Sequence, residues 1–326
     1  MLEAVVEGKN LSFREAYTAF REIFTENPIR IAGFLTALEA KGYTAEEIAG
    51  FAKAMKEFAV EVDAGDVCDV VGTGGDRTMT INVSTASSVI LSVFRRVAKH
   101  GNRSVTSKSG SADFLEKAGI EFNLSPERVV ELIERTNFGF LFAPLYHPKM
   151  GEIMPVRRAL GIRTVFNILG PLLNPANPSS ILVGVSSESI AEKMAVALRY
   201  LGLRNGIVVH GYPLDEANPS GSTLVIELRN GGAEKYSVTP EHFGLRRVKV
   251  IPCLSPKESY ARICRVFDGK GSEEDRIFII LNASLALYSS GFDDLHECRE
   301  MVENVLDGTA MRKLEEIAWV SKSLKG

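Results

Sequence analysis

The stretch VCDVVGTGGDRTMTINVSTASSVIL, from Val67 to Leu91, decides the fold of this chain. It begins with a short β-branched run, continues with three glycines in four positions, and then has small hydroxyl residues that lead into an apolar run. This order predicts a strand, a glycine-rich turn and a helix. Because glycine has no Cβ, its backbone N–H groups can approach a phosphate closely, and a helix N-terminus also attracts anions. We therefore expect this stretch to hold a phosphorylated sugar.

The glycine-rich turn, GTGGD at 72–76, is not a Walker A motif because the Gly-Lys-Ser/Thr element is absent, and it is not GxGxxG either. A tight turn with positive φ would explain its glycines equally well. In the same way, Ser84 and Thr85 could cap the helix rather than bind a ligand. The phosphate hypothesis depends on both elements occurring within about fifteen residues of each other.

A cluster of cationic and amide side chains, KHGNR at 99–103, follows the next apolar run. Lys99 and Arg103 supply positive charge, and the Ser/Gly-rich segment after them adds Lys108. Such a cluster is often a solvated surface, but beside the glycine-rich turn it predicts a basic pocket for a ligand with several phosphates. A nucleic-acid surface would interleave aromatic residues, and this segment contains none.

Two adjacent carboxylates, Asp215 and Glu216, lie in the predicted loop after the apolar run GIVVH. Acidic pairs in loops are most often solvated, but opposite a polyphosphate they offer the hard oxygen ligands that Mg²⁺ prefers. A ligand that needs both cations and a carboxylate-bound metal is a diphosphate. A fifth segment, LYHPKMGEIMPVRRALGIRTVFNILGPLLNP at 145–175, offers His147 and Arg157. Arginine can bind a carboxylate through two parallel hydrogen bonds, although surface residues beside a helix would give the same pattern.

The overall composition restricts the class of protein. The 326 residues are 45% hydrophobic and 24% charged, as in ordinary globular proteins, and the formal net charge is −3. A balance this close to neutral gives no global basic field for nucleic acid. The four cysteines contain no CxxC pair, no apolar run reaches the ~18 residues of a membrane helix, and the N-terminus lacks a signal-peptide pattern. We expect a cytoplasmic protein that binds neither nucleic acid nor membrane.

Hydrophobic periodicity predicts two structural regions. Residues 11–62 contain three helical patterns and no strand, and Ser12 with Glu15 and Thr44 with Glu47 form capping-box pairs. In the remainder, strands alternate with helices, which favours a mostly parallel sheet covered by helices on both faces. The expected fold is α/β, with a small all-helical N-terminal domain and a larger α/β domain with a mostly parallel central sheet.

The elements of the larger region follow from the same patterns. The expected strands lie at 67–75, 97–101, 138–144, 179–185, 206–211 and 222–228. The expected helices lie at 85–97, 111–119, 125–137, 189–202, 255–269, 273–291 and 292–308. The Pro/Asn-rich segment at 170–180 is expected to be irregular.

Taken in order, these motifs resemble the anthranilate phosphoribosyltransferases of tryptophan biosynthesis, a family of the nucleoside phosphorylase-like phosphoribosyltransferases. The matching elements are GTGGD, N-x-S-T, KHGNR, S-x-S-G-S-A-D-x-L-E-x-x-G, the HP…PVRR-x-LG-x-RT-x-FN-x-LGPL-x-NP block and HG…LDE. The resemblance extends from the helical N-terminus to the helix that contains LNASLALYSSG. KHGNR and the PVRR block are the specific signatures, whereas GTGGD is shared with pyrimidine nucleoside phosphorylases.

The resemblance implies a helical domain at 1–65, completed by part of 150–180, and an α/β domain at 66–326, with the active site between them. It implies a glycosyltransferase that moves the 5-phosphoribosyl group of 5-phosphoribosyl-1-diphosphate (PRPP) to the amino group of anthranilate. The products are N-(5-phosphoribosyl)anthranilate and diphosphate. Members of the family require Mg²⁺ and commonly form homodimers through the helical domain.

The resemblance also assigns roles to individual residues, and none of them serves as a nucleophile or general base. The implied PRPP site consists of Gly72, Thr73, Gly74, Gly75, Asp76, Thr80, Asn82, Ser84, Thr85, Lys99 and Ser111. The implied anthranilate site consists of Gly72, His100, Asn102, His147 and Arg157. The implied Mg²⁺ ligands are Ser88, Asp215 and Glu216.

Three segments depart from the family pattern. Pro213 and Leu214 stand where a glycine is usual two residues before the acidic pair, the following ANPSGST is longer, and PCLSPKESYARICRVFDG replaces a Gly-Gly-Asp…Glu-Asn-Ala segment. Two alternatives remain at this point: a pyrimidine nucleoside phosphorylase, and a non-catalytic relative that binds nucleic acid. KHGNR and the PVRR block argue against the first, and the net charge and the acidic pair argue against the second.

Overall fold

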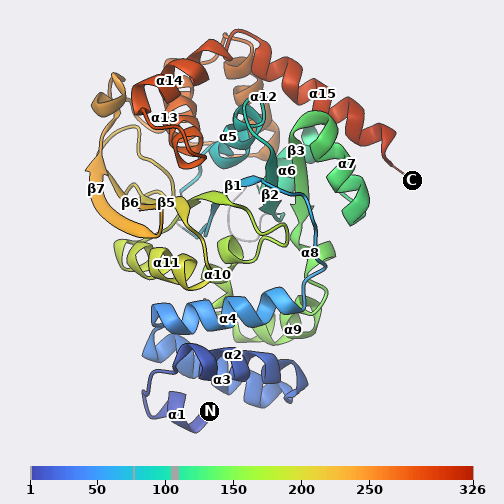
Figure 1. The fold of residues 1–326 in the computed structure, drawn as a ribbon, viewed down its shortest axis with the longest axis vertical. Helices are drawn as coiled ribbons and strands as arrows, with labels where there is room; N and C mark the ends of the chain where they lie inside the picture. Colours follow the sequence, from blue (N-terminus) through green and yellow to red (C-terminus); the bar gives the residue numbers. More distant parts are fainter. Residues whose placement is uncertain (1, 76–77, 104–109, 326) are drawn as a thin grey trace.

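A computed structural model describes residues 2–75, 78–103 and 110–325 of the chain. Figure 1 shows a layer of N-terminal helices, coloured blue, below a larger part in which helices cover both faces of a sheet. The predicted fold class is therefore confirmed. Within the residues that the structure describes, no helix combines the length and the apolar character needed to cross a membrane.

The N-terminal helices begin at the capping residues that the sequence indicated. Ser12 and Glu15 form a capping box at the start of α2, and Thr44 and Glu47 form another at the start of α4. Each capping side chain accepts a hydrogen bond from a backbone N–H that the helix itself leaves unpaired. The layer consists of α1 (Leu2–Val6), α2 (Phe13–Glu22), η1 (Ile23–Thr25), α3 (Pro28–Lys41) and α4 (Ala45–Glu57).

A later segment returns to this layer and packs within it. Ile153 and Val156 belong to the same buried cluster as Phe20 of α2 and Phe51 of α4. The ring of Phe166 lies 5.2 Å from the ring of Phe20. The segment consists of α8 (Ala143–Tyr146), α9 (Met150–Leu160), α10 (Phe166–Leu169) and η2 (Gly170–Leu172).

One seven-stranded sheet, in the order β3-β2-β1-β4-β5-β6-β7, forms the centre of the larger part. Its strands are β1 (Cys68–Gly72), β2 (Val97–Gly101), β3 (Phe138–Phe142), β4 (Ser180–Gly184), β5 (Asn205–His210), β6 (Thr223–Arg229) and β7 (Gly232–Val238). Strands β1 to β5 are parallel, whereas β6 and β7 run antiparallel to their neighbours. The chain adds β2 and β3 on one side of β1, and β4 and β5 on the other. Ligands of open α/β sheets bind at the carboxyl ends of the strands, where the order reverses in this way.

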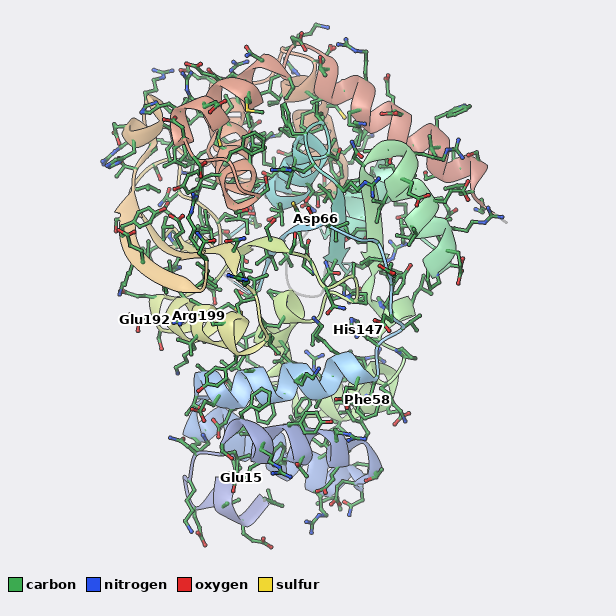
Figure 2. All side chains as sticks on the ribbon, viewed as in Figure 1. Glu15, Phe58, Asp66, His147, Glu192 and Arg199 are labelled. Carbon is green, nitrogen blue, oxygen red and sulfur yellow. The ribbon has the colours of Figure 1, made fainter. Side chains whose placement is uncertain are left out.

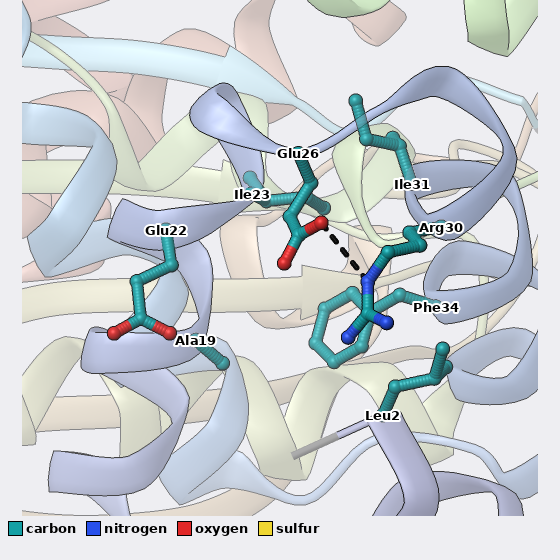
Figure 3. A pocket seen from close by; sticks show the side chains of 8 residues that line it. All are labelled: Leu2, Ala19, Glu22, Ile23, Glu26, Arg30, Ile31 and Phe34. Carbon is teal, nitrogen blue, oxygen red and sulfur yellow. Dashed lines mark ion pairs between the residues drawn. The ribbon is translucent and has the colours of Figure 1, made fainter.

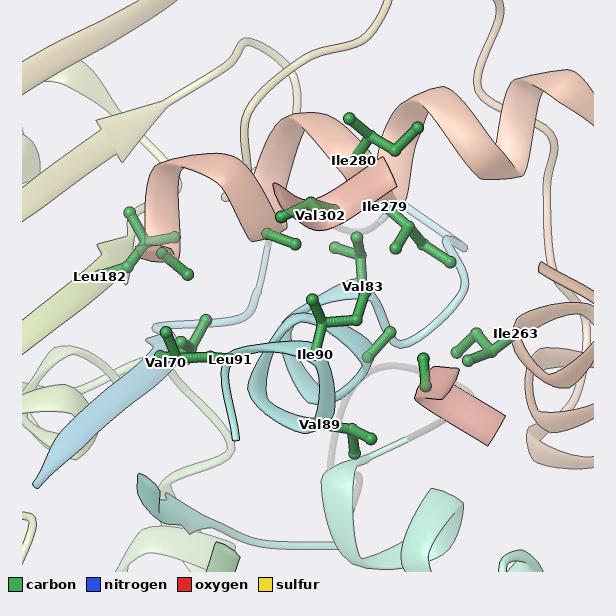
Figure 4. Close-up of a cluster of buried hydrophobic side chains, with 14 of the residues drawn as sticks. Val70, Val83, Val89, Ile90, Leu91, Leu182, Ile263, Ile279, Ile280 and Val302 are labelled. Carbon is green, nitrogen blue, oxygen red and sulfur yellow. The ribbon is translucent and has the colours of Figure 1, made fainter. Parts of the chain in front are cut away.

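Helices cover both faces of this sheet. On one face, α5 and α13 pack against each other, and the cluster between them includes Val89, Ile90 and Ile279 (Figure 4). These side chains are almost completely buried, and each contributes about 1.5–3 kcal/mol relative to an exposed position. This face carries α5 (Val83–Leu91), α6 (Ser111–Lys117), η3 (Pro240–Phe243), α12 (Pro256–Phe267), α13 (Glu273–Ser289), α14 (Leu295–Asn304) and α15 (Thr309–Ser323). Helix α7 (Pro126–Thr136) packs against β3, and α11 (Glu188–Tyr200) packs between β5 and α4.

The structure differs from the sequence expectations at several elements, including the short helix α1 at the N-terminus, which was not expected. Strand β7 was not expected, because its exposed, charged sequence GAEKYSV has no apolar alternation to reveal an edge strand. Helix α15 was not expected either, although it carries apolar residues at helical spacing. The helix expected at 85–97 is shorter, because α5 ends at Leu91 and a turn precedes β2.

The carboxyl ends of β1 and β4 come unusually close to a loop from another part of the chain. Gly72 and Gly184 lie opposite each other in register. The loop that follows β5 crosses directly over them: a Cβ on Gly184 would lie 1.6 Å from the backbone oxygen of Asp215, and one on Gly72 would lie 2.6 Å from its Oδ2. No side chain fits at Gly184, because the obstacle there is the backbone of the loop, whereas a side chain at Gly72 would displace the Asp215 carboxylate.

Replacing Gly184 with alanine should therefore push this loop away from β4. Overpacking of this kind costs about 1–3 kcal/mol, so Gly184→Ala should unfold at a lower urea concentration than the parent chain. Gly33→Ala in α3, where a Cβ would meet no atom within 4 Å, is the matched control and should not lower the unfolding midpoint. Equal midpoints for the two variants would contradict the close approach.

Candidate active site

A polar cavity opens at the carboxyl ends of β1 and β2. Its wall combines the glycine-rich turn, the start of α5, the end of β2 and the acidic loop after β5. The predicted site residues that line it are Gly72, Gly74, Gly75, Thr80, Asn82, Ser84, Lys99, His100, Asn102, Ser111, Asp215 and Glu216. The structure thus brings the main sequence motifs together in one place.

Several predicted residues do not line this cavity. Thr73 donates its N–H to the backbone oxygen at the end of β4 at 2.9 Å. Ser88 lies one turn inside α5, where its hydroxyl donates to the backbone oxygen of Ser84 at 2.8 Å. Ser88 therefore does not face the cavity as a metal ligand would, whereas Ser84 does. Asp76 and Lys108 lie outside the described residues.

The start of α5 is organised by Asn82 rather than by the hydroxyl residues after it. Asn82 is the N-cap, and its side-chain oxygen accepts from the N–H of Thr85 at 3.2 Å. The N–H of Asn82 donates to Ser259 Oγ of α12 at 2.9 Å. The hypothesis that Ser84 or Thr85 caps the helix is therefore wrong, and Ser84 in the first turn faces the cavity. The Thr85 hydroxyl is buried and meets no hydrogen-bond partner in the described part of the chain.

The glycine-rich turn and the acidic loop are in direct contact. The N–H of Gly74 donates to Asp215 Oδ2 at 2.6 Å, and the Thr80 hydroxyl lies 3.5 Å from Glu216 Oε2. Gly74 and Gly75 have φ angles of 64° and 81°, which glycine adopts without strain. Asp215 is 8% exposed. A cation held by this acidic pair would therefore lie beside the glycine-rich turn.

Lys99 is a buried cation close to the turn. Its ammonium donates to the backbone oxygen of Val70, and the residue is 2% exposed. Burial lowers the pKa of Lys99, while the carboxylates of Asp69 and Glu216 oppose that shift because they favour the charged form. Burial likewise raises the pKa of Asp69, and Lys99 opposes it. Lys99 thus places a positive charge close to the glycine-rich turn, and the buried carboxylate of Asp69 on β1 compensates that charge.

Asp69 and Asn174 belong to this site although the sequence analysis did not single them out. Asn174 donates from Nδ2 to Asp69 Oδ2 at 2.8 Å and to the backbone oxygen of Ala98 at 2.7 Å. Asp69 Oδ1 also accepts from the N–H of His100 at 3.3 Å. The network ties β1 to β2 and fastens the irregular segment at 170–180 to both. The signal in the sequence is the acidic residue inside the β-branched run VCDVV, because a buried carboxylate needs partners.

The segment after β2 forms another edge of the cavity. Ser111 Oγ donates to the backbone oxygen of Asn102 at 3.1 Å. A Cβ on Gly101 would lie 2.2 Å from that hydroxyl oxygen, so a side chain at this position would displace the Ser111 hydroxyl and the ring of Phe140. Arg103, expected to add charge to the pocket, is instead paired with Asp113 at 3.2 Å and with Glu116 on α6.

Two histidines form a buried pair next to the cavity. The rings of His100 and His147 lie 5.1 Å apart at an interplanar angle of 69°. Figure 2 shows His147 between the sheet and the helical layer. His100 Nδ1 lies 3.3 Å from the backbone oxygen of Gly170. Within the described residues, His100 Nε2 and both ring nitrogens of His147 are buried without a hydrogen bond of normal geometry, which leaves them available to a polar ligand.

Burial keeps both imidazoles neutral. It lowers the pKa of His100 to about 3 and the pKa of His147 to about 4. The backbone at Gly170 and Leu173 opposes these shifts, and the positive charge of Lys56 adds to them. At neutral pH the pair therefore offers neutral nitrogen donors and acceptors rather than positive charge.

Arg157 lies beside Phe166, outside the cavity wall. Its guanidinium carbon is 5.0 Å from the centre of the Phe166 ring, and burial lowers its pKa. Its Nη1 lies 3.6 Å from Met154 Sδ, and it makes no ion pair with a carboxylate in the part of the chain that the structure describes. A half-buried guanidinium in these surroundings is suited to a carboxylate ligand.

Comparison with known proteins first defines the class. The model of a glycosyl transferase family's helical bundle domain matches residues 1–59. The model of a glycosyl transferase family's α/β domain matches residues 64–311. The fold and the site are therefore those of a glycosyl transferase.

Individual relatives define the family. The anthranilate phosphoribosyltransferase of Pyrococcus furiosus is 56% identical over 324 residues, which are 99% of this chain and 100% of that protein. The crystal structure of the enzyme of that name from Thermus thermophilus has a TM-score of 0.92 and 38% identity, and covers 98% of this chain and 99% of its own. The Saccharomyces cerevisiae structure in complex with PRPP and Mg has a TM-score of 0.89 and 29% identity, over 99% and 98% of the two chains. The chain belongs to the anthranilate phosphoribosyltransferase family.

The neutral histidine pair has a consequence for stability at low pH. The pKa of His147 is about 4 in the folded chain and about 6.5 in an unfolded chain. The stability that the neutral ring contributes to the fold is therefore complete above pH 6.5 and is lost as the pH falls toward 4. Between pH 7.5 and pH 5 that loss is about 2 kcal/mol. His147→Gln should therefore reduce the decline in the free energy of unfolding between these two pH values, measured by urea denaturation.

His296→Gln is the control for this measurement, because His296 is exposed on α14. It should keep the decline of the parent chain. The same decline in all three proteins would contradict the neutral state of His147.

Proposed function

We propose that this chain transfers the 5-phosphoribosyl group from PRPP to the amino nitrogen of anthranilate, giving N-(5-phosphoribosyl)anthranilate and diphosphate in tryptophan biosynthesis. The observation that carries the proposal is the convergence of the glycine-rich turn, Lys99 and the pair Asp215–Glu216 on one cavity. The full-length similarity to named members of the family supports it. That similarity also disfavours the pyrimidine nucleoside phosphorylase and the nucleic-acid-binding relative.

The diphosphate of PRPP binds in this proposal at the glycine-rich turn and at the first turn of α5. Free N–H groups at a helix start and in a glycine turn favour phosphate oxygens, and the positive charge of Lys99 adds to them. Thr73 and Thr85 do not line the cavity, so in this proposal they act through their backbone N–H bonds, which fix the glycine-rich turn and the start of α5. The complete proposed set is Gly72, Thr73, Gly74, Gly75, Asp76, Thr80, Asn82, Ser84, Thr85, Lys99 and Ser111.

The residues of the cavity fit Mg²⁺. No cluster of three or more His, Cys, Asp or Glu side chains forms a complete metal cage within the described residues. Mg²⁺ does not need one, because it usually binds through one or two carboxylates together with substrate phosphates and water. Asp215 and Glu216 would supply the carboxylates, and Ser84 is better placed than Ser88 to supply a hydroxyl. Bound there, Mg²⁺ would neutralise charge on the diphosphate.

The chain's own residues bind and orient the substrates rather than attack them. The aromatic amine of anthranilate is unprotonated near neutral pH, so its nitrogen can attack C1 of the ribose without a strong general base. Charge develops on the diphosphate as its bond to C1 breaks, and the buried positive charge of Lys99 stabilises that charge. Holding the two substrates in line supplies a further part of the acceleration.

Anthranilate binds in this proposal near Gly72, Asn102 and the neutral histidine pair, with Arg157 facing its carboxylate. The buried Nε2 of His100, which meets no hydrogen-bond partner within the described residues, supports this placement, because a neutral amine suits an uncharged partner. The Saccharomyces cerevisiae protein has been solved in complex with 4-fluoroanthranilate, which supports an aromatic amino acid site in this fold.

We also propose that the helical layer, residues 1–65 with part of 150–180, acts as one domain and forms a homodimer contact in the cytoplasm. Val6 and Ile29 are 67% and 84% exposed in this layer, and a small pocket lies there (Figure 3). Its lining consists of Leu2, Ala19, Glu22, Ile23, Glu26, Arg30, Ile31 and Phe34. Analytical sedimentation of the purified protein tests whether it is a dimer in solution. Cell fractionation tests whether it is found in the cytoplasm.

The reaction is tested by following anthranilate fluorescence as PRPP and Mg²⁺ are added to the purified protein. A loss of fluorescence that needs protein, PRPP and Mg²⁺, and that EDTA prevents, is expected. Replacing Asp215 and Glu216 together with alanine should reduce kcat/KM by roughly 100-fold or more, by analogy with the loss of a preorganised stabilising group.

The matched control replaces Glu315 and Glu316, an adjacent exposed pair on α15, with alanine, and it should retain full activity. Near-normal activity in the variant that lacks Asp215 and Glu216 would rule out their role. Absence of any fluorescence change with the parent protein would refute the proposed reaction.

Arg157→Ala should raise the KM for anthranilate by about 10- to 100-fold, because a hydrogen bond to a charged group contributes about 1.5–3 kcal/mol. The KM for PRPP should change much less. Arg158→Ala, at the exposed neighbouring position, is the matched control and should leave both constants unchanged. Equal effects of Arg157→Ala on both KM values would argue against its contact with anthranilate.

A further inference from the structure

The loop that carries the acidic pair, residues 211–222 between β5 and β6, contains no helix or strand. Hydrogen bonds of Asn218 shape it from within. Asn218 accepts from the N–H of Ser220 at 2.8 Å and donates to the backbone oxygen of Tyr212 at 2.7 Å. Its own N–H donates to Thr223 Oγ1 at 2.8 Å, at the start of β6. These bonds give the loop its form but leave open what fixes it to the other layers of the protein.

A second asparagine, Asn282 of α13, fastens the loop from outside. Asn282 Oδ1 accepts from the N–H of Ala217 at 2.9 Å, and Asn282 Nδ2 donates to the backbone oxygen of Ala217 at 3.1 Å. Nδ2 also donates to the backbone oxygen of Phe278 at 3.0 Å. Ala217 is completely buried and Asn282 is 3% exposed. The primary amide suits this place because it donates and accepts at once without carrying a charge.

Helix α13 gives this amide a rigid base. The helix is buried along most of its length, and Ile279 and Ile280 pack in the cluster shared with α5 (Figure 4). Helix α5 begins at the cavity, so α13 supports the proposed phosphate site by its apolar packing against α5. Through Asn282, α13 also supports the loop that carries Asp215 and Glu216. An amide in such apolar surroundings is costly unless it is paired, so its bonds to Ala217 are strongly favoured.

We propose that Asn282 is a positioning residue for the acidic pair. Ala217 follows Glu216 directly, so the two bonds that fix Ala217 also fix where the carboxylates of Asp215 and Glu216 stand relative to the glycine-rich turn. Asn282 bonds backbone atoms and therefore acts through the loop rather than on a ligand. The inference rests on the proposed function, because it takes the acidic pair as the Mg²⁺ site.

The test uses Asn282→Leu, which keeps the approximate volume and removes all three hydrogen bonds. PRPP binding is measured by calorimetry over a range of Mg²⁺ concentrations and again in EDTA. The Mg²⁺ concentration for half-maximal PRPP binding should rise about 10- to 100-fold, as is usual when an outer partner of a metal ligand is lost. PRPP affinity in EDTA should equal that of the parent chain.

Ser284→Ala is the matched control, because Ser284 is equally buried on the same helix and its hydroxyl donates to Ile280 of that helix at 2.7 Å. It should leave the Mg²⁺ requirement unchanged. In a protein that already lacks the carboxylates of Asp215 and Glu216, Asn282→Leu should have no further effect on PRPP binding. If Asn282→Leu does not fold, Asn282→Ala is measured against the same criteria.

The outcomes separate this inference from the proposed function. A parent chain with Mg²⁺-dependent PRPP binding, and an unchanged Mg²⁺ requirement in the Asn282 variant, would leave the function standing and overturn the positioning role. Equal losses of PRPP affinity with Mg²⁺ and in EDTA would also overturn it, because a merely structural defect acts on both. A parent chain without Mg²⁺-dependent PRPP binding would overturn the proposed metal site itself.

Discussion

The contact between the acidic loop and the glycine-rich turn is the constraint on which the rest of the site depends. It needs glycine at the end of β4, because a Cβ at Gly184 would occupy the space of the Asp215 backbone, and a Cβ at Gly72 would displace the Asp215 carboxylate. It also needs β1 and β4 to be neighbours in register, so that the two glycines lie side by side. The close approach of the acidic loop to the ends of β1 and β4 therefore depends on the strand order, on the parallel direction of the strands and on the loop after β5. The hydrogen bond from Gly74 to Asp215 is its direct result.

The charges around this contact are compensated inside the protein. The carboxylates of Asp69 and Glu216 favour the charged form of Lys99, and Asn174, which follows η2, donates a hydrogen bond to Asp69. The histidine pair beside it is neutral, because burial disfavours its protonation. The site thus keeps charged groups next to the proposed diphosphate and uncharged groups next to the proposed aromatic amine. That division matches the chemistry of the two substrates.

The sequence predicted the fold class and most of the polar residues that line the candidate cavity, and the failures have physical reasons. The N-terminal helices were predictable because their capping residues and apolar spacing agree with each other. The hydroxyl proposed for Mg²⁺ was not, because Ser84 and Ser88 are four residues apart and share one face of α5, so the choice between them depends on where the helix begins. That start is set by Asn82 together with Ser259 of α12, a contact across the fold. The contacts of Asn282 were hidden as well, since a single amide in an apolar helix does not indicate its partner.

The hydrogen bond between Gly74 and Asp215 joins residues that are 141 positions apart, and Asn282 lies a further 65 positions beyond Ala217. During synthesis, the chain therefore completes its glycine-rich turn long before the acidic loop exists, and the loop before the helix that fastens it. Contacts of such long range form slowly, because the intervening chain must be ordered first. The site is then a property of the finished molecule, absent from any shorter nascent chain. A substrate that binds it favours the complete fold over every partly folded form, so that the substrate itself would help to retain the mature protein.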